Sequence, residues 1–514
     1  MWIFSKINKF DLLFLSILLI LFYLFKFDDI LYLPPRSIHQ WRQCDALSFI
    51  KNYYYENLNL FQPKIHFQNE SDGSAVGEFP IIYYINAQIW KLTSENYLTI
   101  RLSNLTIFYV GLYNVYKLSF NILKNYFSAI FVSILILSSP IVTYYSVSFL
   151  TNIPALSFLF ISWRYGYNYY LNQSKNLLLP ILFFTISILL RPTLIIGGIP
   201  FLIFFVIILF KKKIKLKIIL SKVLILCLPY ILLFLWVFFA NKYNEENNSS
   251  YFLLKMKPIW ESENVKLILD QIQKNTLYQI YCKKTLLSIF LGFILTNIYL
   301  IKRKLFNMFI VLNSLFFLSL FYCFSWFENL DVHDYYFIDC FPFLTILFIF
   351  FFFIINQMKY KISLFSIFSV LLFINVLYGA SLHRMKYYTK KSPVINFMLE
   401  KEVIQYYDWF HWDYNLKYAD YESITPYLRK IGIKREDKVI STYDSSPNIT
   451  LALMDVKGYS NLYNETMLPQ QLVDKFKNKR IKYLISNQAF DTLYNNHLIK
   501  IGSFKKIHIF KFKN

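Results

Sequence analysis

The chain has 514 residues, of which 56% are hydrophobic, and its mean hydropathy is +0.38. This composition excludes a soluble globular protein, because repeated apolar runs long enough to cross a bilayer of ~30 Å indicate a polytopic membrane protein. The formal net charge is +23, with lysines concentrated in short loops and in the tail. That placement is typical of membrane topology and of contact with membrane lipids, so we expect no nucleic-acid partner.

About eleven apolar segments are candidates for membrane-spanning helices. They lie at about 10–27, 98–121, 126–145, 150–170, 175–190, 193–210, 217–240, 285–301, 306–326, 338–356 and 361–381. The first follows Lys6 and Lys9 without a small-residue cleavage site, so we predict that it is retained as a membrane helix. A shorter run, 79–92, is interrupted by polar residues and is predicted to be an interfacial helix.

The basic loops predict the topology of these segments. Lysine and arginine cluster at 211–217, 302–304 and 358–361, which places these loops and the N-terminus in the cytoplasm. The resulting outer segments are 28–97, 241–284, 327–337 and everything after 382. No acidic residue lies between Asn96 and Asn244 or between Gln271 and Phe327, and all seven histidines fall in outer segments. We therefore expect any acid–base or metal chemistry on the outer face of the cell membrane.

The composition turns polar from about residue 383, which divides the chain into a membrane domain (1–382) and a C-terminal outer domain (383–514). Residues 438–443, 481–486 and 507–512 read as strands, and Pro469–Phe476 reads as the start of a helix. The fold class predicted is thus an α-helical polytopic membrane protein with a small extracytoplasmic α/β domain. The domain lacks a GxGxxG motif or a P-loop, so nucleotide binding is not expected.

Two acids of the first outer loop are candidate catalytic residues. Asp45 lies where a polar stretch passes into the helix-like run 46–53, and a carboxylate beside a membrane can act as general base for an incoming hydroxyl. The alternative is an acid at a helix N-terminus, stabilised by the helix dipole. Glu78 precedes Phe79-Pro80 at the start of the interfacial helix, where it is either a cap-region charge or a site group.

His39, Trp41 and Arg42 form a compact group in the sequence that can bind a phosphate or a sugar face. Arginine offers a planar fork to phosphate oxygens, whereas tryptophan offers a flat surface to a pyranose ring. The alternative is an aromatic-belt tryptophan beside a snorkelling arginine.

Later segments contribute further candidates. Arg191 interrupts the apolar run 177–210. A cation there is costly unless it is paired or faces a polar cavity. Arg191 is therefore either a ligand of a phosphate or a snorkelling residue that caps a hairpin. Asn152 opens the preceding outer-side span and can line the site. The outer loop 327–336 carries three acids and His333, so a divalent cation is conceivable, although no i, i+4 histidine pair supports one. Its tyrosines are more often belt residues than catalytic ones.

Taken in order, these motifs resemble the GT-C glycosyltransferases of the protein O-mannosyltransferase and lipid A aminoarabinose transferase group (glycosyltransferase family 39). The motifs that carry the resemblance are, in chain order, His39-Gln-Trp-Arg-Gln-Cys-Asp45, Phe49-Ile-Lys-Asn-Tyr-Tyr-Tyr-Glu-Asn57, Gly77-Glu78-Phe-Pro-Ile-Ile-Tyr-Tyr84, Arg101-Leu-Ser103, Ser138-Ser-Pro140 with Tyr144-Tyr145, His333-Asp-Tyr-Tyr336, Lys438-Val-Ile440, Ser446-Pro447 and Lys457-Gly458-Tyr459. The resemblance covers nearly the whole chain. The sequence departs from the family pattern because Asp45 is followed by Ala46 rather than by a second acid.

The resemblance implies inverting transfer of a sugar from a polyprenyl-phosphate donor to a lipid, protein or glycan acceptor outside the membrane. It implies that Asp45 is the base or a site carboxylate and that Glu78 is the second acid. The residues it implies for donor binding are His39, Trp41, Arg42, Arg191, His333 and Tyr335, with Asn152 and Asp334 in support. Arg191 and His333 would meet the lipid phosphate, whose developing charge needs a cation or a metal ion.

Three other functions remain open from the sequence. A polytopic transporter or lipid flippase usually places ionisable residues at mid-membrane and shows repeats, whereas this chain collects its acids in outer segments. A non-catalytic subunit of cell-envelope assembly would have the same outline and differ only in activity. An oligosaccharide ligase would share the fold but transfer a preassembled glycan.

Overall fold

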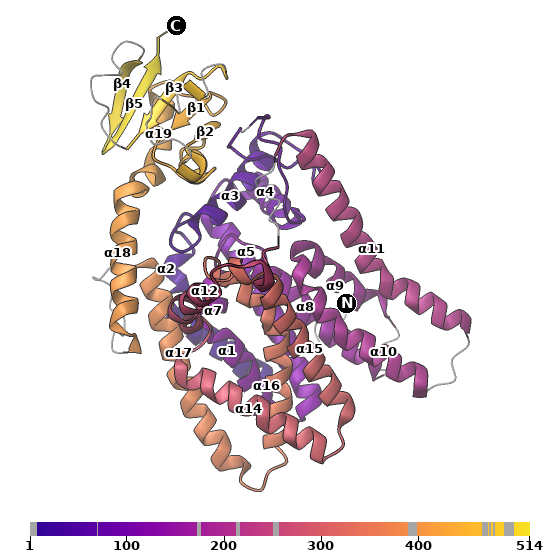
Figure 1. The fold of residues 1–514 in the computed structure, drawn as a ribbon. Helices are drawn as coiled ribbons and strands as arrows, with labels where there is room; N and C mark the ends of the chain where they lie inside the picture. The colour runs from indigo at the N-terminus through magenta and orange to yellow at the C-terminus, as the bar shows by residue number, and fades with distance from the viewer. Residues whose placement is uncertain are drawn as a thin grey trace.

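The computed structural model describes residues 8–68, 70–171, 176–211, 216–249, 256–388, 398–464, 471, 474–475, 479–487 and 498–513. A bundle of long helices makes up most of the molecule, and a small sheet stands at one end of it, joined to the bundle by α18 (Figure 1). The sheet contains the C-terminal strands, so the polar C-terminal part of the sequence forms the part of the structure at this end of the helical bundle.

Every predicted apolar segment is helical in the structure. The helices concerned are α1 (Lys9–Leu24), α5 (Tyr97–Leu123), α6 (Tyr126–Leu137) with α7 (Pro140–Ser146), α8 (Asn152–Tyr170), α9 (Leu178–Leu190), α10 (Ile199–Lys211), α11 (Leu216–Glu246), α14 (Lys283–Lys302), α15 (Phe306–Ser325), α16 (Phe341–Ile355) and α17 (Lys361–Tyr387). Within the described residues, five helical segments are long and apolar enough to cross a membrane: Leu220–Glu246, Lys283–Lys302, Phe306–Ser325, Asp334–Ile355 and Lys361–Tyr387. The pair α6 and α7, bent by 75°, is a sixth if it forms one span. The predicted number of about eleven spans stays a prediction.

Short helices and turns connect these segments. They are α2 (Phe27–Ile30), η1 (Pro192–Gly198), η2 (Ile259–Glu261), α12 (Val265–Gln271), η3 (Ile272–Thr276), α13 (Leu277–Ile280), η4 (Phe327–Asn329) and η5 (Asp334–Cys340). Residues 28–97, the predicted first outer loop, contain two further helices, α3 (Gln40–Tyr55) and α4 (Ile81–Thr93), which pack against each other. Helix α4 matches the run predicted to be an interfacial helix.

Helix α3 begins earlier than the sequence predicts. His39 has a left-handed backbone (φ 53°) and ends the preceding turn, so the helix starts at Gln40 rather than near residue 46. Asp45 therefore lies beyond the first turn, which contains no acidic residue. The alternative interpretation of Asp45 as an acid at a helix N-terminus is wrong, because the dipole effect is confined to the first turn.

The C-terminal part has the α/β character that the sequence predicts. Its elements are α18 (Lys401–Lys417), η7 (Ala419–Ser423), α19 (Thr425–Lys430), β1 (Val439–Ser441), α20 (Ile449–Met454), β2 (Gly458–Ser460), η8 (Leu462–Asn464), β3 (Tyr483–Ser486), β4 (Leu498–Phe504) and β5 (Ile507–Phe512). The strand order is β2-β1-β3-β5-β4, with β1 parallel to β2 and β3, and β5 antiparallel to β3 and β4.

The three predicted strands are confirmed as β1, β3 and β5. The sequence analysis did not predict β2 or β4. Strand β2 has three residues, too few to show the alternation of a strand, and Gly502 interrupts the register of β4. Most of the predicted helix at Pro469–Phe476 lies outside the described residues.

The first outer loop and the C-terminal part share one hydrophobic core. Residues Leu47 and Ile50 of α3 are buried in the same cluster as Leu451 of α20 and Ile485 of β3. The backbone also joins them, because the Gly458 N–H donates to the carbonyl of His66 (3.1 Å). The predicted division at 382/383 falls inside α17, which ends at Tyr387.

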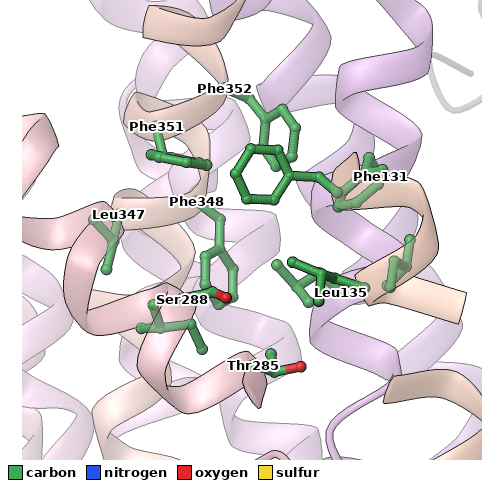
Figure 2. Close-up of a pocket in the computed structure, with 13 residues that line it drawn as sticks. Phe131, Leu135, Thr285, Ser288, Leu347, Phe348, Phe351 and Phe352 are labelled. Carbon is green, nitrogen blue, oxygen red and sulfur yellow. The ribbon is translucent and has the colours of Figure 1, made fainter. Parts of the chain in front are cut away.

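An apolar cavity of about 50 Å³ lies between α6, α14, α16 and α17 (Figure 2). Phenylalanine and leucine side chains make up most of its wall, together with Thr285 and Ser288. Both hydroxyls already have partners, since Ser288 donates to the Lys284 carbonyl (2.8 Å) and Thr285 contacts the Cys282 sulfur (3.2 Å). The lining of the cavity therefore contains no acidic side chain, and its two hydroxyls are both partnered.

Candidate active site

Arg42 lies between the two candidate catalytic acids. Its Nη1 donates to Oδ2 of Asp45 (3.3 Å), and its Nη2 donates to Oε2 of Glu78 (3.2 Å). Arg42 and Asp45 are three residues apart on α3, a spacing that puts both on one face. Glu78 comes from the segment before α4 and also accepts a hydrogen bond from the Tyr83 hydroxyl. One guanidinium thus holds both carboxylates in place.

The electrostatics of this cluster favour its charged form. Burial by itself raises the pKa of Glu78, but the Arg42 cation and the Tyr83 hydroxyl outweigh it and lower the pKa below its ordinary value. Burial likewise lowers the pKa of Arg42, but Glu78 and Asp45 outweigh it and raise that pKa well above its ordinary value. The side chain of Glu78 is 17% exposed and that of Asp45 is 1% exposed, so Glu78 is the more accessible acid.

Asn448 donates a second hydrogen bond to the Asp45 carboxylate, in addition to the one from Arg42. Its Nδ2 donates to Oδ1 of Asp45 (2.8 Å), and its Oδ1 accepts from the backbone N–H of Phe67 (3.0 Å). Asn448 precedes α20 and is fully buried. The C-terminal part of the chain therefore contributes directly to the geometry of the carboxylate in the first outer loop.

His39 and Asp334 form a second pair. Nε2 of His39 lies 3.0 Å from Oδ1 of Asp334, which also accepts from the Tyr145 hydroxyl. Nζ of Lys386 lies 4.0 Å from the other oxygen of Asp334 and donates to Gln279 (2.7 Å). Asp334 thus connects the start of α3 to the outer ends of α7 and α17.

Arg191 forms a third pair, with Asp339. Its Nε and Nη2 donate to Oδ2 of Asp339 at 3.0 and 2.8 Å. The hydroxyls of Thr193 and Tyr322 also donate to that carboxylate, at 2.7 and 2.8 Å. The guanidinium lies 4.7 Å from the ring centre of Tyr336. Arg191 is therefore paired with an acid inside the protein and does not reach toward the membrane surface. A charge next to apolar segments is tolerated when it is paired in this way.

Tyr335 and His333 lie between the pairs. The ring of Tyr335 is 5.0 Å from the ring of His39, centre to centre. The Arg191 guanidinium is 5.8 Å from the centre of the Tyr335 ring. His333 lies 5.5 Å from His39, ring to ring. Burial, followed by the nearby His39 and Arg42, lowers the pKa of His333 to about 3, so its ring is neutral at physiological pH. The predicted role of His333 at the lipid phosphate stays a prediction, and its neutral ring can form a hydrogen bond.

In the predicted group of His39, Trp41 and Arg42, Trp41 contacts a different part of the chain from the other two, because its ring lies 5.6 Å from that of Tyr463 in the C-terminal part. His39 and Arg42 contact different acids, but both lie near His333. Trp41 is separated from them because neighbours at i+1 and i+2 on a helix do not share a face. Asn152 is buried at the start of α8, and its Nδ2 has no hydrogen-bond partner in the part of the chain that the structure describes.

Three residues close to the predicted site were missed from sequence: Asp339, Lys386 and Asn448. Asp339 lies inside the apolar run 338–356, and an acid in such a run is itself a signal of function that could have found it. Asn448 has no local signal, because its partner is 403 positions away. Among the described residues, no group of three or more His, Cys, Asp or Glu side chains is arranged to hold a metal ion.

The fold of the chain is similar to that of solved structures of ArnT, which agrees with the resemblance found in the sequence. Two of these structures are of ArnT from Cupriavidus metallidurans. The apo structure has 10% sequence identity and a TM-score of 0.59, covering 99% of this chain and 98% of that one. The structure bound to undecaprenyl phosphate has 10% identity and a TM-score of 0.57, covering 97% of each chain. No protein-family model and no curated protein matches the chain.

Proposed function

We propose that this protein is an integral membrane glycosyltransferase that moves a sugar from a polyprenyl-phosphate donor to an acceptor on the outer face of the membrane. Two lines support the proposal. The first is the full-length similarity in fold to ArnT, including a structure with undecaprenyl phosphate bound. The second, which carries the proposal, is the pair of carboxylates of Asp45 and Glu78 held by Arg42 in the first outer loop.

The reaction requires a base for the acceptor. As the acceptor oxygen attacks the anomeric carbon, its hydroxyl proton passes to a carboxylate, and the bond from that carbon to the phosphate oxygen breaks. Asp45 and Glu78 are the candidate acceptors of the proton, and Arg42 and Asn448 fix the orientation of Asp45. One displacement at the anomeric carbon inverts its configuration.

The departing polyprenyl phosphate needs cationic partners. Arg191 uses Nε and Nη2 on Asp339, and no described residue accepts a hydrogen bond from its Nη1. That nitrogen is therefore available to a phosphate oxygen, and a guanidinium in a buried site stabilises developing phosphate charge strongly. Tyr335 lies beside both Arg191 and His39 and is the surface on which we place the sugar or its phosphate.

The test uses purified protein in lipid nanodiscs with radiolabelled polyprenyl-phosphate sugars. Release of polyprenyl phosphate is measured for the wild type, Asp45→Asn and Glu78→Gln, with Asp72→Asn as matched control. Asp72 is an acid of the same outer loop whose side chain is 60% exposed and paired with Lys64. We expect turnover by the wild type and the control, and loss in the two site variants.

The outcomes separate the alternatives. Loss in only one site variant identifies that residue as the base. Turnover that persists in both variants removes the carboxylate mechanism. Donor binding without turnover by the wild type, with every donor tried, contradicts the transferase and favours a flippase or a non-catalytic assembly subunit.

A further inference from the structure

Helix α18 carries an exposed aromatic stripe, which we define as Tyr406, Trp409, Trp412 and Leu416. Their exposed fractions are 42%, 55%, 61% and 47%. The spacing of three to four residues places all four on one side of the helix. The opposite side is buried against the protein through Val403, Tyr407, His411 and Tyr414. Contiguous exposed aromatic surface of this kind marks an interaction site.

No ring contact joins the stripe to another element in the described part of the chain. The ring contacts of Tyr406 are with residues of α18 itself: Tyr407, Trp409 and Phe410. Trp412 has no ring contact among the described residues. The exposed side of α18 therefore faces surroundings that lie outside the described part of the chain.

The position of α18 indicates what these surroundings are. Glu400, just before the helix, forms an ion pair with Lys283, the first residue of α14 (2.7 Å). Nε2 of His411 lies 2.8 Å from the carbonyl oxygen of Met385, near the end of α17. Helix α18 thus stands beside the ends of two candidate membrane spans, at the side of the bundle that leads to the C-terminal sheet (Figure 1).

The length of α17 sets the depth of the stripe. The helix has 27 residues, whereas about 20 are enough to cross the hydrocarbon core, so its last turns reach the headgroup region. Met385 lies in those turns and contacts the same helix that bears Trp409 and Trp412.

We propose that the aromatic stripe of α18 lies in the headgroup region of the outer leaflet. Tryptophan and tyrosine prefer this region because each has an apolar ring body and a polar group that can remain hydrated. The partner is the phospholipid bilayer, which a helix with one aromatic face can engage without spanning it. Lipid contact at α18 fixes the height of the C-terminal sheet above the membrane.

The test is residue-specific and independent of activity. The protein is labelled with fluorotryptophan, placed in phosphatidylcholine nanodiscs, and its nine tryptophans are observed by fluorine NMR. Trp409→Phe and Trp412→Phe assign two of the resonances. Lipid bearing a nitroxide near the headgroup and a water-soluble gadolinium chelate are then added in separate samples. Trp90, fully buried, is the control that the chelate should not broaden.

We expect both assigned resonances to be lost with the nitroxide lipid and to be largely retained with the chelate. Loss with the chelate alone would show that the stripe faces water and would overturn the proposal. Retention with both reagents would also overturn it, because the stripe would then be covered by protein, such as a second copy of the chain. Neither result depends on whether the protein transfers a sugar.

Discussion

Asn448 donates a hydrogen bond from its Nδ2 to Oδ1 of Asp45 over 2.8 Å, although the two residues are 403 positions apart in the chain. The bond joins the segment before α20 to the middle of α3. Because Arg42 binds the other oxygen of Asp45, the carboxylate has a fixed orientation. Asn448 is a positioning residue, since it acts on the proposed site through Asp45.

Substitution Asn448→Ala removes a hydrogen bond to a charged and buried group, whose contribution is about 1.5–3 kcal/mol. We expect kcat of the proposed transferase to fall by about 10- to 100-fold, with donor KM much less affected. Substitution Asn448→Asp places a second carboxylate beside Asp45 and should move the acid limb of the pH–rate profile upward. An unchanged kcat and pH profile in both variants would contradict the positioning role.

Substitution Arg42→Lys keeps the positive charge but loses the planar fork that reaches both Asp45 and Glu78. We expect kcat/KM to fall by at least about 10-fold, because one amine cannot keep both carboxylates in register. Arg36→Lys is the matched control, since Arg36 pairs with Glu422 away from the two acids (2.5 Å). Radiolabelled transfer assays on the two lysine variants make the comparison, and equal losses in both would remove the special role of Arg42.

The sequence predicted the helices well because long apolar runs have few alternatives to helix in a membrane. It also identified His39, Arg42, Glu78 and Arg191, which the structure places around Tyr335 or in direct contact with Asp45. It could not identify Asn448, because a contact between distant parts of the chain leaves no local pattern. It grouped Trp41 with its sequence neighbours because the start of α3 was predicted too late. The catalytic roles of these residues stay predictions.

Substitution Asp339→Asn leaves the buried Arg191 without its anionic partner. Breaking such a pair from one side costs about 3–5 kcal/mol, so we expect a clearly lower Tm in nanodiscs. Arg191→Lys keeps a cation but not the paired nitrogens, and we expect donor KM to rise by about 10-fold. Donor titration and thermal unfolding separate the two effects, and an unchanged donor KM in Arg191→Lys would argue against phosphate contact.

His66 makes stability depend on pH. Burial, assisted by Arg435 and Lys51, lowers its pKa from about 6.5 to about 4, against the opposing effect of Asp455. The unfolded chain therefore binds more protons than the folded protein between these values, so stability is lost as pH falls from about 6.5 to 4. This shift in the pKa of His66 corresponds to a change of roughly 3 kcal/mol in the free energy of unfolding. Thermal unfolding across this range should show the loss, and a His66→Gln variant should show a smaller pH slope; an equal slope would contradict the assignment.

Substitution Gly458→Ala should destabilise the outer part of the protein. A Cβ at this position would lie 1.9 Å from the carbonyl oxygen of Val439, in backbone that cannot move without breaking the β1–β2 pairing. The glycine also binds the first outer loop, as its carbonyl accepts from the Gln68 N–H (2.8 Å). We expect a loss of several kcal/mol, seen as faster proteolysis of the outer segments. Gly432→Ala is a milder comparison, because its Cβ would meet open space and only the left-handed backbone (φ 86°) opposes the substitution.

The shared core of α3 and the C-terminal sheet has a consequence for biosynthesis. Ile507 and Ile509, close to the end of the chain, are buried in the same cluster as Cys44 and Ala46. Helix α3 leaves the ribosome long before these apolar partners, which lie far behind it in the chain. The loop that carries Asp45 must therefore wait, with its packing surface uncovered, until those residues have been translated. A quality-control protease that recognises exposed apolar helices would have that interval in which to act.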